Sequence, residues 1–139
     1  MLTELRTDPA LTPAFVEEIL RYDSPVQLAS RWAPAGAEVE GVTLPPGAQV
    51  LILAGAANRD PRRFDNPDVF DPHRPSNQPV SFGGGAHYCL GAALARLEGR
   101  IAFSRLLEKF SVITRAGEPV RRDRLTLRRW ETLPVSLQR

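Results

Sequence analysis

The residues with the clearest chemical potential lie in one glycine-rich stretch that contains the only cysteine of the chain. The stretch runs from Phe82 to Gly91 and reads Phe-Gly-Gly-Gly-Ala-His-Tyr-Cys-Leu-Gly. Its three consecutive glycines allow a tight bend close to a bulky group. Cys89 comes just before a predicted helix, whose unpaired N–H groups and dipole favour an anion. The pattern therefore favours a thiolate, which is the form of cysteine that ligates metals.

Residue types alone leave other uses of this stretch open. A lone cysteine is most often an inert small hydrophobe. In an extended segment, alternate residues share a face, so His87 and Cys89 could form the base and nucleophile of a cysteine hydrolase. A structural zinc site is disfavoured because His73, His87 and Cys89 lack paired ligand spacing. A phosphate loop is disfavoured because no Gly-Lys-Ser/Thr or G-x-G-x-x-G spacing occurs.

Composition indicates a globular chain that forms one domain or a piece of a larger one. The 139 residues are 42% hydrophobic and 24% charged, which excludes wholesale disorder and a fibrous chain. The 10 glycines and 13 prolines predict much irregular loop. No apolar run reaches the roughly 18 residues of a membrane span. A single cysteine excludes an internal disulfide and, with no secretory signal, favours a cytoplasmic location.

The net charge of +2 arises from 18 basic and 16 acidic residues, a small excess. The densest basic run, from Arg121 to Arg129, has few flanking aromatic residues that could stack on bases. We therefore expect a solvated charged face here, and no nucleic-acid partner.

Two helices are predicted around the glycine-rich stretch. The first covers residues 13–23, with Thr12 as the N-cap, Pro13 in the first helical position and Pro25 beyond its end. The second begins after Gly91 and extends to about Lys109. An apolar stripe runs along this second helix and consists of Leu90, Leu94, Leu97 and Ile101, extended by Leu106 and Leu107.

Short strands and turns are predicted elsewhere. Strand candidates lie at residues 26–33, 38–39, 42–44 and 49–53, with a Glu40-Gly41 turn between the second and third. Residues 54–59 could form one helical turn, and residues 60–79 form an irregular meander rich in proline and asparagine. Alternation at 125–127 and again at 133–137 predicts a β-hairpin. The expected fold class is α+β, mainly helical.

The stretch Phe82–Gly91 resembles the complete haem-binding signature of the cytochrome P450 haem-thiolate monooxygenases, a family in which a cysteine thiolate ligates haem iron. Further motifs of the family follow in the right order. Glu18-Ile19-Leu20-Arg21 resembles the E-x-x-R helix, and Arg74 matches the arginine of the meander. Residues 56–61 are similar to bacterial soluble members. The resemblance covers nearly all of residues 3–139.

This resemblance implies that residues 1–139 are the C-terminal, haem-binding part of a cytochrome P450 domain. The implied elements are the E-x-x-R helix, a small β-sheet, the meander, the cysteine-ligand loop, a long proximal helix and a C-terminal β-hairpin. The distal oxygen-activating helix and the N-terminal segments that roof the substrate pocket are absent. Part of the stripe at Leu94, Leu97 and Ile101 is therefore expected to form an exposed apolar patch.

The resemblance also implies roles for individual residues. Cys89 is the expected axial ligand of the iron in haem b (iron protoporphyrin IX), and Phe82 is expected to shield its sulfur. His87 and Arg31 match positions that contact the haem propionates. Gly83 and Gly91 belong to the bend and to the backbone donors around the sulfur. A buried structural triad is expected of Glu18, Arg21 and Arg74.

The implied activity is hydroxylation of a small apolar molecule with O2 and electrons from NAD(P)H, delivered by a ferredoxin-type donor and its reductase. Residues 26–29 and the turn near Thr132 and Leu133 resemble regions that meet substrate. A truncated, non-catalytic haem-binding remnant is the alternative from another class. The cysteine hydrolase built on His87 and Cys89 is a third possibility.

Overall fold

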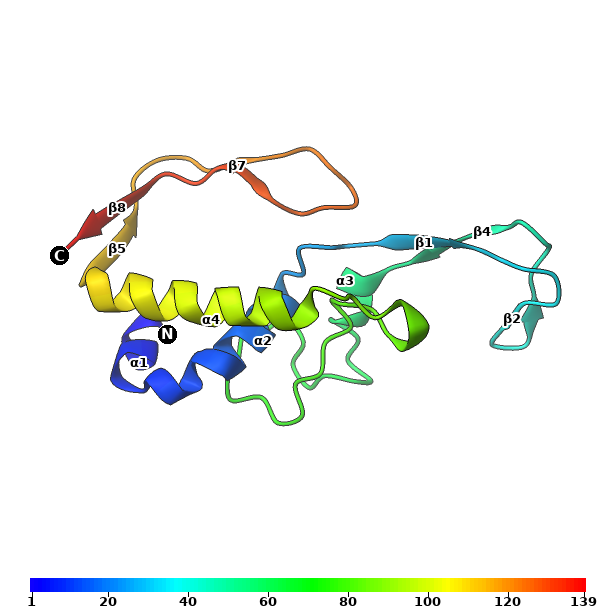
Figure 1. Cartoon of the computed structure of the whole chain (residues 1–139), viewed down its shortest axis with the longest axis horizontal. Helices are drawn as coiled ribbons and strands as arrows, with labels where there is room; N and C mark the ends of the chain where they lie inside the picture. Colours follow the sequence, from blue (N-terminus) through cyan, green and yellow to red (C-terminus); the bar gives the residue numbers. More distant parts are fainter.

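The computed structural model describes all 139 residues and places the helices in the middle of the molecule, with paired strands extending from them (Figure 1). The α-helices are α1 (Leu2–Thr7), α2 (Thr12–Tyr22), α3 (Ala54–Ala57) and α4 (Ala92–Lys109), and the 3-10 helices are η1 (Pro9–Leu11) and η2 (Gly85–His87). The long helix α4 lies alongside α1 and α2, as Figure 1 shows. More residues lie in helices than in strands, so the fold is α+β and mainly helical, as predicted.

Helix α2 forms where the sequence predicts it, but its N-cap differs from the expectation. Thr12 is already helical, with φ −53° and ψ −42°, and its hydroxyl donates to the Pro9 carbonyl at 2.8 Å. The chain passes directly from the 3-10 helix η1 into α2. Thr12 is therefore the first residue of α2 and does not act as its N-cap. The capping side chain is that of Asp8, which accepts a hydrogen bond from the Ala10 amide at 3.1 Å.

The hydrophobic core lies between α2 and α4. Its buried cluster consists of Leu5, Leu11, Phe15 and Leu107. The Phe15 ring meets those of Phe70 and Phe103 edge to face, with centroids 5.4 and 5.3 Å apart. Gly99 of α4 faces Val16 of α2, and a Cβ at Gly99 would lie only 3.2 Å from a Val16 methyl. The missing side chain therefore allows the two helices to approach closely.

The N-terminal strands form two small antiparallel pairs. Strand β1 (Ala29–Trp32) pairs with β4 (Gln49–Ile52), and Arg31 lies opposite Val50. The second pair is the hairpin of β2 (Glu38–Val39) and β3 (Val42–Thr43). Its turn residues Glu40 and Gly41 have φ of 50° and 77°. Positive φ at both turn positions suits the right-handed twist of a hairpin, so the predicted turn is confirmed.

The C-terminal strands pair differently from the prediction. Strand β5 (Val112–Arg115) pairs with β8 (Val135–Gln138), and β6 (Val120–Arg121) pairs with β7 (Trp130–Thr132). A C-terminal hairpin is therefore present, between β6 and β7, but residues 125–127 and 133–137 do not pair with each other as predicted. Leu127 instead bridges Val26, and the Thr126 carbonyl accepts from the Gln27 amide at 2.9 Å. Local alternation shows that a segment is extended, but it does not show which distant segment it pairs with.

The structure also contains the predicted meander and an exposed apolar patch on α4. Residues 60–79 form an irregular meander, as expected. The N-terminal part of the apolar stripe of α4 is exposed, at 59%, 53% and 52% for Leu94, Leu97 and Ile101, and the neighbouring Leu90 is fully exposed. The predicted extension differs, because Leu107 is buried in the core. None of the helices has the length and apolar character required to cross a lipid bilayer.

The meander is joined to α1 by a pair of side chains that should titrate. His73 Nε2 lies 2.7 Å from the Glu4 carboxylate, and this hydrogen bond, with the negative charges around it, raises the pKa of His73 above 6.5. Because the pKa of His73 is raised in the folded state, the pair contributes its full stabilisation below the pKa that His73 has in the unfolded chain. This contribution is lost as the pH rises through the pKa of His73 in the folded chain.

We expect NMR titration to give His73 a pKa above 6.5. Glu4→Gln should lower this pKa toward the ordinary value because it removes the charged acceptor. Glu98→Gln, an exposed change on α4, should leave the titration of His73 unchanged. An identical His73 titration in the Glu4 variant would contradict the pairing.

Candidate functional site

The glycine-rich loop folds back on itself and presents Cys89 beside the first turn of α4. The Cys89 amide donates to the Phe82 carbonyl at 2.9 Å and so closes the loop. Gly83 and Gly85 adopt φ of 73° and 60°, which side chains disfavour, so these two glycines permit the bend. Gly91 occupies the N-cap position of α4, and a Cβ there would lie 3.9 Å from the Cys89 sulfur. The loop therefore places an exposed cysteine at a helix N-terminus.

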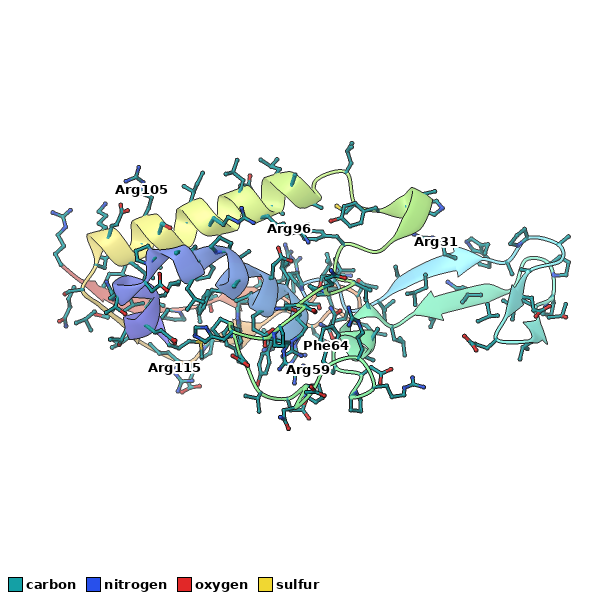
Figure 2. The ribbon with its side chains drawn as sticks, turned by 90° about the horizontal axis from the view of Figure 1, so that it is seen from below. Arg31, Arg59, Phe64, Arg96, Arg105 and Arg115 are labelled. Atoms are coloured by element: carbon teal, nitrogen blue, oxygen red, sulfur yellow. The ribbon has the colours of Figure 1, made fainter.

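The other predicted haem contacts lie within this loop or on β1. Phe82 is half-buried and His87 is exposed in η2. Arg31 is exposed on β1, and its guanidinium donates only to the neighbouring Ser30 carbonyl, at 2.8 Å (Figure 2). Neither Arg31 nor His87 forms an ion pair within the chain, so both remain available to an anionic ligand.

Glu18 and Arg21 form a fully buried, two-point ion pair on one face of α2. Arg21 Nε donates to Glu18 Oε2 at 2.8 Å, and Arg21 Nη2 donates to Oε1 at 2.7 Å. Both side chains are 0% exposed. The remaining Arg21 donors reach the backbone carbonyls of Asn58, just after α3, and of Pro67 and Val69 in the meander, at 2.8–3.0 Å. Each N–H group of this buried guanidinium therefore has a hydrogen-bond acceptor.

Arg74 brings the meander to the same carboxylate. Its Nε lies 3.6 Å from Glu18 Oε1, which is an ion-pair distance but too long for a hydrogen bond. Other Arg74 nitrogens donate to meander carbonyls, including that of Val69 at 3.1 Å. Glu18 also accepts from the Asp71 amide at 2.8 Å and from Asn77 Nδ2 at 2.9 Å. One buried carboxylate thus organises the chain around residues 65–77.

A second buried network, which was not predicted, anchors the start of the cysteine loop. Asn58 Nδ2 donates to the Ser24 and Ser81 hydroxyls at 2.7 and 2.8 Å. Asn58 Oδ1 accepts from the Val80 amide at 2.7 Å, and the Ser81 hydroxyl donates to the Leu20 carbonyl at 2.6 Å. The only sequence signal was Asn58 itself, which stands inside the family-like stretch at residues 56–61.

A third network, also not predicted, lies at the other end of the loop. Arg96 of α4 forms a two-point ion pair with Glu17 of α2 and donates to the Tyr88 hydroxyl at 2.8 Å (Figure 2). Its guanidinium also covers the Phe82 ring, 4.7 Å from the centroid. The hydrogen bond to Glu17 is the main reason that the pKa of Arg96 is raised. No sequence signal pointed to these contacts.

The basic run near the C-terminus is an exposed surface partly neutralised by acidic residues. Arg128 lies 3.0 Å from Asp23, and Arg121 lies 3.7 Å from the same carboxylate. Arginines of the run line one side of a cavity of about 540 Å³, and Gln27 and Leu28 line another part of it. Gln27 and Leu28 belong to the predicted substrate-contact region, but none of the expected haem contacts borders this cavity.

The donor set fits a metal that brings most of its own ligands. No cluster of three or more His, Cys, Asp or Glu side chains is placed to hold a metal ion. Cys89 is thus a single exposed donor, which suits an iron already held by a macrocycle and does not suit a bare ion in a protein cage. Arg31 and His87 are exposed basic side chains, which is the chemical type that pairs with the carboxylates of such a macrocycle.

A protein-family model described as "Cytochrome P450" matches residues 4–134. The chain therefore belongs to the cytochrome P450 family, and its fold is the C-terminal part of the P450 fold.

Curated relatives are identical to this chain at nearly half of the aligned positions. "Putative cytochrome P450 140" of Mycobacterium tuberculosis is 48% identical over 137 residues, covering 98% of this chain and 31% of that protein. "Biotin biosynthesis cytochrome P450" of Bacillus subtilis is 46% identical over 138 residues, covering 99% of this chain and 35% of that protein. The chain thus spans about a third of the length of these relatives.

Solved structures agree with the sequence relatives. P450BioI, crystallised with an acyl carrier protein ligated to hexadec-9Z-enoic acid, superposes with a TM-score of 0.94 at 47% identity, over 99% of this chain and 36% of that one. CYP109E1 of Bacillus megaterium in complex with testosterone gives a TM-score of 0.90 at 32% identity, over 96% and 38%. The small sheets, meander and cysteine loop therefore belong to an arrangement shared with complete P450 structures.

Proposed function

We propose that residues 1–139 are part of one P450 domain and form the cysteine-bearing side of its haem b site. The observation that carries this proposal is the closed loop from Phe82 to Gly91, which holds an exposed Cys89 at the N-terminus of α4 in a chain of the P450 family. The family membership supports haem, and the single available cysteine supports Cys89 as its iron ligand.

When bound, the haem supplies an iron centre able to activate O2. The chain's own residues supply its surroundings. The α4 N-terminus lies beside Cys89, and Gly91 leaves room for backbone N–H groups near the sulfur, which would temper its charge when it ligates the iron. Phe82, half-buried at the start of the loop, would pack beside the haem and shield the sulfur from that side. Arg31 and His87 would hold the two propionates. Gly83 holds the bend at positive φ.

The reaction we assign to the complete domain is hydroxylation of a small apolar molecule. Its electrons come from NAD(P)H through a ferredoxin-type donor and its reductase. Apolar ligands in the neighbouring structures, a hexadecenoic acyl group in one and testosterone in another, support this substrate class. The unpaired Cys89 supports a cytoplasmic site of action.

A non-catalytic haem-binding remnant is the second candidate. Such a chain would bind haem at Cys89 without a closed substrate pocket. A cysteine hydrolase has less support because no hydrogen bond joins the His87 ring to the Cys89 sulfur, although both residues lie in one loop. Labelling with a thiol-reactive ester probe would reveal such an activity.

The spectrum of the haem-loaded chain tests the ligand assignment. We expect the ferrous CO complex to show the strongly red-shifted Soret band for which the family is known, because thiolate ligation produces it. Cys89→Ser should abolish that band, whereas Ala86→Ser, which adds the same hydroxyl to an exposed position of the same loop, should retain it. An unchanged spectrum in the Cys89 variant would overturn the assignment.

A further inference from the structure

The cysteine loop is attached to α2 at both of its ends, by two separate sets of side chains. At its start, Ser81 is buried against the C-terminal end of α2 through the Leu20 carbonyl and the Ser24 hydroxyl. At its far end, Arg96 on α4 reaches Glu17 on α2. Between these points, residues 83–91 are exposed, so the loop has little packing of its own to fix the position of Cys89.

Arg96 contacts the residues that flank Cys89 in space. Its Nη1 donates to the hydroxyl of Tyr88, which immediately precedes Cys89 in the chain. Its guanidinium lies over the ring of Phe82, the residue whose carbonyl accepts the Cys89 amide. One side chain thus contacts both Tyr88 and Phe82, and no hydrogen bond joins it to the Cys89 sulfur.

The other half of the guanidinium is fixed by α2. Arg96 Nη2 donates to Glu17 Oε2 at 3.1 Å, and Arg96 Nε donates to the other carboxylate oxygen. The two side chains are only 23% and 19% exposed, so water and salt screen them less than a surface pair. A two-point arginine–carboxylate pair also fixes the plane of the guanidinium. The position of Arg96 is therefore set by a helix that lies outside the loop.

A glycine-rich loop has more conformational freedom to lose than other segments. The backbone hydrogen bonds from the Cys89 amide to Phe82 and from the Ala92 amide to the Cys89 carbonyl close the loop, but they do not fix the side chains of Tyr88 and Phe82 on either side of it. The contacts of Arg96 with Tyr88 and Phe82 remove much of that freedom at its two ends.

We propose that Arg96 is a positioning residue for the Cys89 sulfur. Because Glu17 holds the Arg96 guanidinium against α2, the guanidinium restricts the movement of Tyr88 and Phe82. The Cys89 sulfur is thereby kept pointing out of the loop. The consequence for the metal site rests on the proposed haem ligation, but the effect on the loop itself can be measured without haem.

Hydrogen exchange of the haem-free chain tests the positioning directly. Arg96→Met keeps the length of the side chain but removes every hydrogen bond, so the Cys89 amide should exchange about fivefold faster or more. Amides in the middle of α4 should be unaffected. Tyr88→Phe removes only the hydroxyl and should act in the same direction but less strongly. Arg105→Met is the matched control, because Arg105 lies on the same helix with its side chain 78% exposed.

The haem-loaded chain supplies a readout that a purely structural role would not move. In Arg96→Met we expect a larger share of the ferrous CO complex without the red-shifted band, and a shifted reduction potential. Arg96→Lys retains the charge but not the two-point geometry. It should restore part of the red-shifted band and bring the reduction potential part of the way back to that of the parent chain. Arg105→Met should match the parent chain.

Two results would overturn the proposal. One is unchanged exchange of the Cys89 amide in both Arg96→Met and Tyr88→Phe. The other is a uniform acceleration across α2, α4 and the loop, which would make Arg96 a support of the whole fold. If the parent chain lacks the red-shifted band while the exchange results hold, the haem assignment fails and the positioning of the loop by Arg96 stands.

Discussion

Replacing Glu18 with alanine is expected to lower the free energy of unfolding by about 3–5 kcal/mol, because it leaves buried charge without a partner. Glu18 is 0% exposed, and Arg21 and Arg74 both face its carboxylate. The change also removes the acceptor of the Asp71 amide and of the Asn77 side chain. Two arginines and two neutral donors therefore lose the same acceptor. Urea unfolding of the variant and the parent chain gives the difference.

Glu118→Ala is the matched control for this measurement. Glu118 also pairs with an arginine three residues away, Arg115, but at 3.3 Å and with its own side chain 87% exposed. An exposed pair of this kind contributes about 0–1 kcal/mol, so the midpoint of unfolding should change little. Similar unfolding midpoints for the two alanine variants would show that Glu18 behaves as an ordinary surface residue.

The parts of the fold that could be predicted are those that depend on neighbours in the sequence. Helix α4 begins after Gly91 and ends at Lys109, as its helical periodicity indicated. The β2–β3 hairpin forms because Glu40 and Gly41 suit a tight turn. The pairing of β5 with β8 could not be predicted, because it joins segments more than twenty residues apart whose alternation is equally compatible with other partners.

The same distinction explains which parts of the site were missed. Glu18 and Arg21 are three residues apart on one helix, so their proximity follows from helix geometry. Glu17 and Arg96 are 79 residues apart, and Ser24 and Ser81 are 57 residues apart. A local pattern cannot show that such residues meet. The cysteine loop could be recognised because its glycines and Cys89 are contiguous, whereas the contacts that hold it in place come from α2.

Helix α4 exposes an apolar surface beside the cysteine loop. Helix α4 buries Ala92 and Leu107, but Leu94, Leu97 and Ile101 remain half or more exposed, and Leu90 is fully exposed. Isolated soluble domains rarely expose a continuous apolar patch of this kind, which usually marks an interface or a tendency to aggregate. The loop beside this patch also leaves Cys89 exposed. The 139 residues therefore place the candidate ligand on an open surface.

We expect the isolated 139-residue chain, loaded with haem, to consume NAD(P)H without forming a matching amount of hydroxylated product. Coupled hydroxylation requires that water be excluded around the reacting centre and that protons be delivered in a controlled way. The candidate site has no such enclosure, because the cysteine loop and Arg31 are exposed. Reduced oxygen should then escape as peroxide. The chain should also self-associate or bind haem loosely through its apolar patch.

The measurement combines the haem-loaded chain with a ferredoxin and its reductase, and compares NAD(P)H consumed, peroxide released and product formed over a panel of apolar substrates. Cys89→Ser is the control for consumption that does not depend on the thiolate, and it should lower peroxide release to the background of the redox partners. Product formed in proportion to NAD(P)H by the unmodified chain would contradict the prediction. It would show that residues 1–139 build an enclosed reaction site by themselves, for example by association of two copies over the Leu94, Leu97 and Ile101 patch.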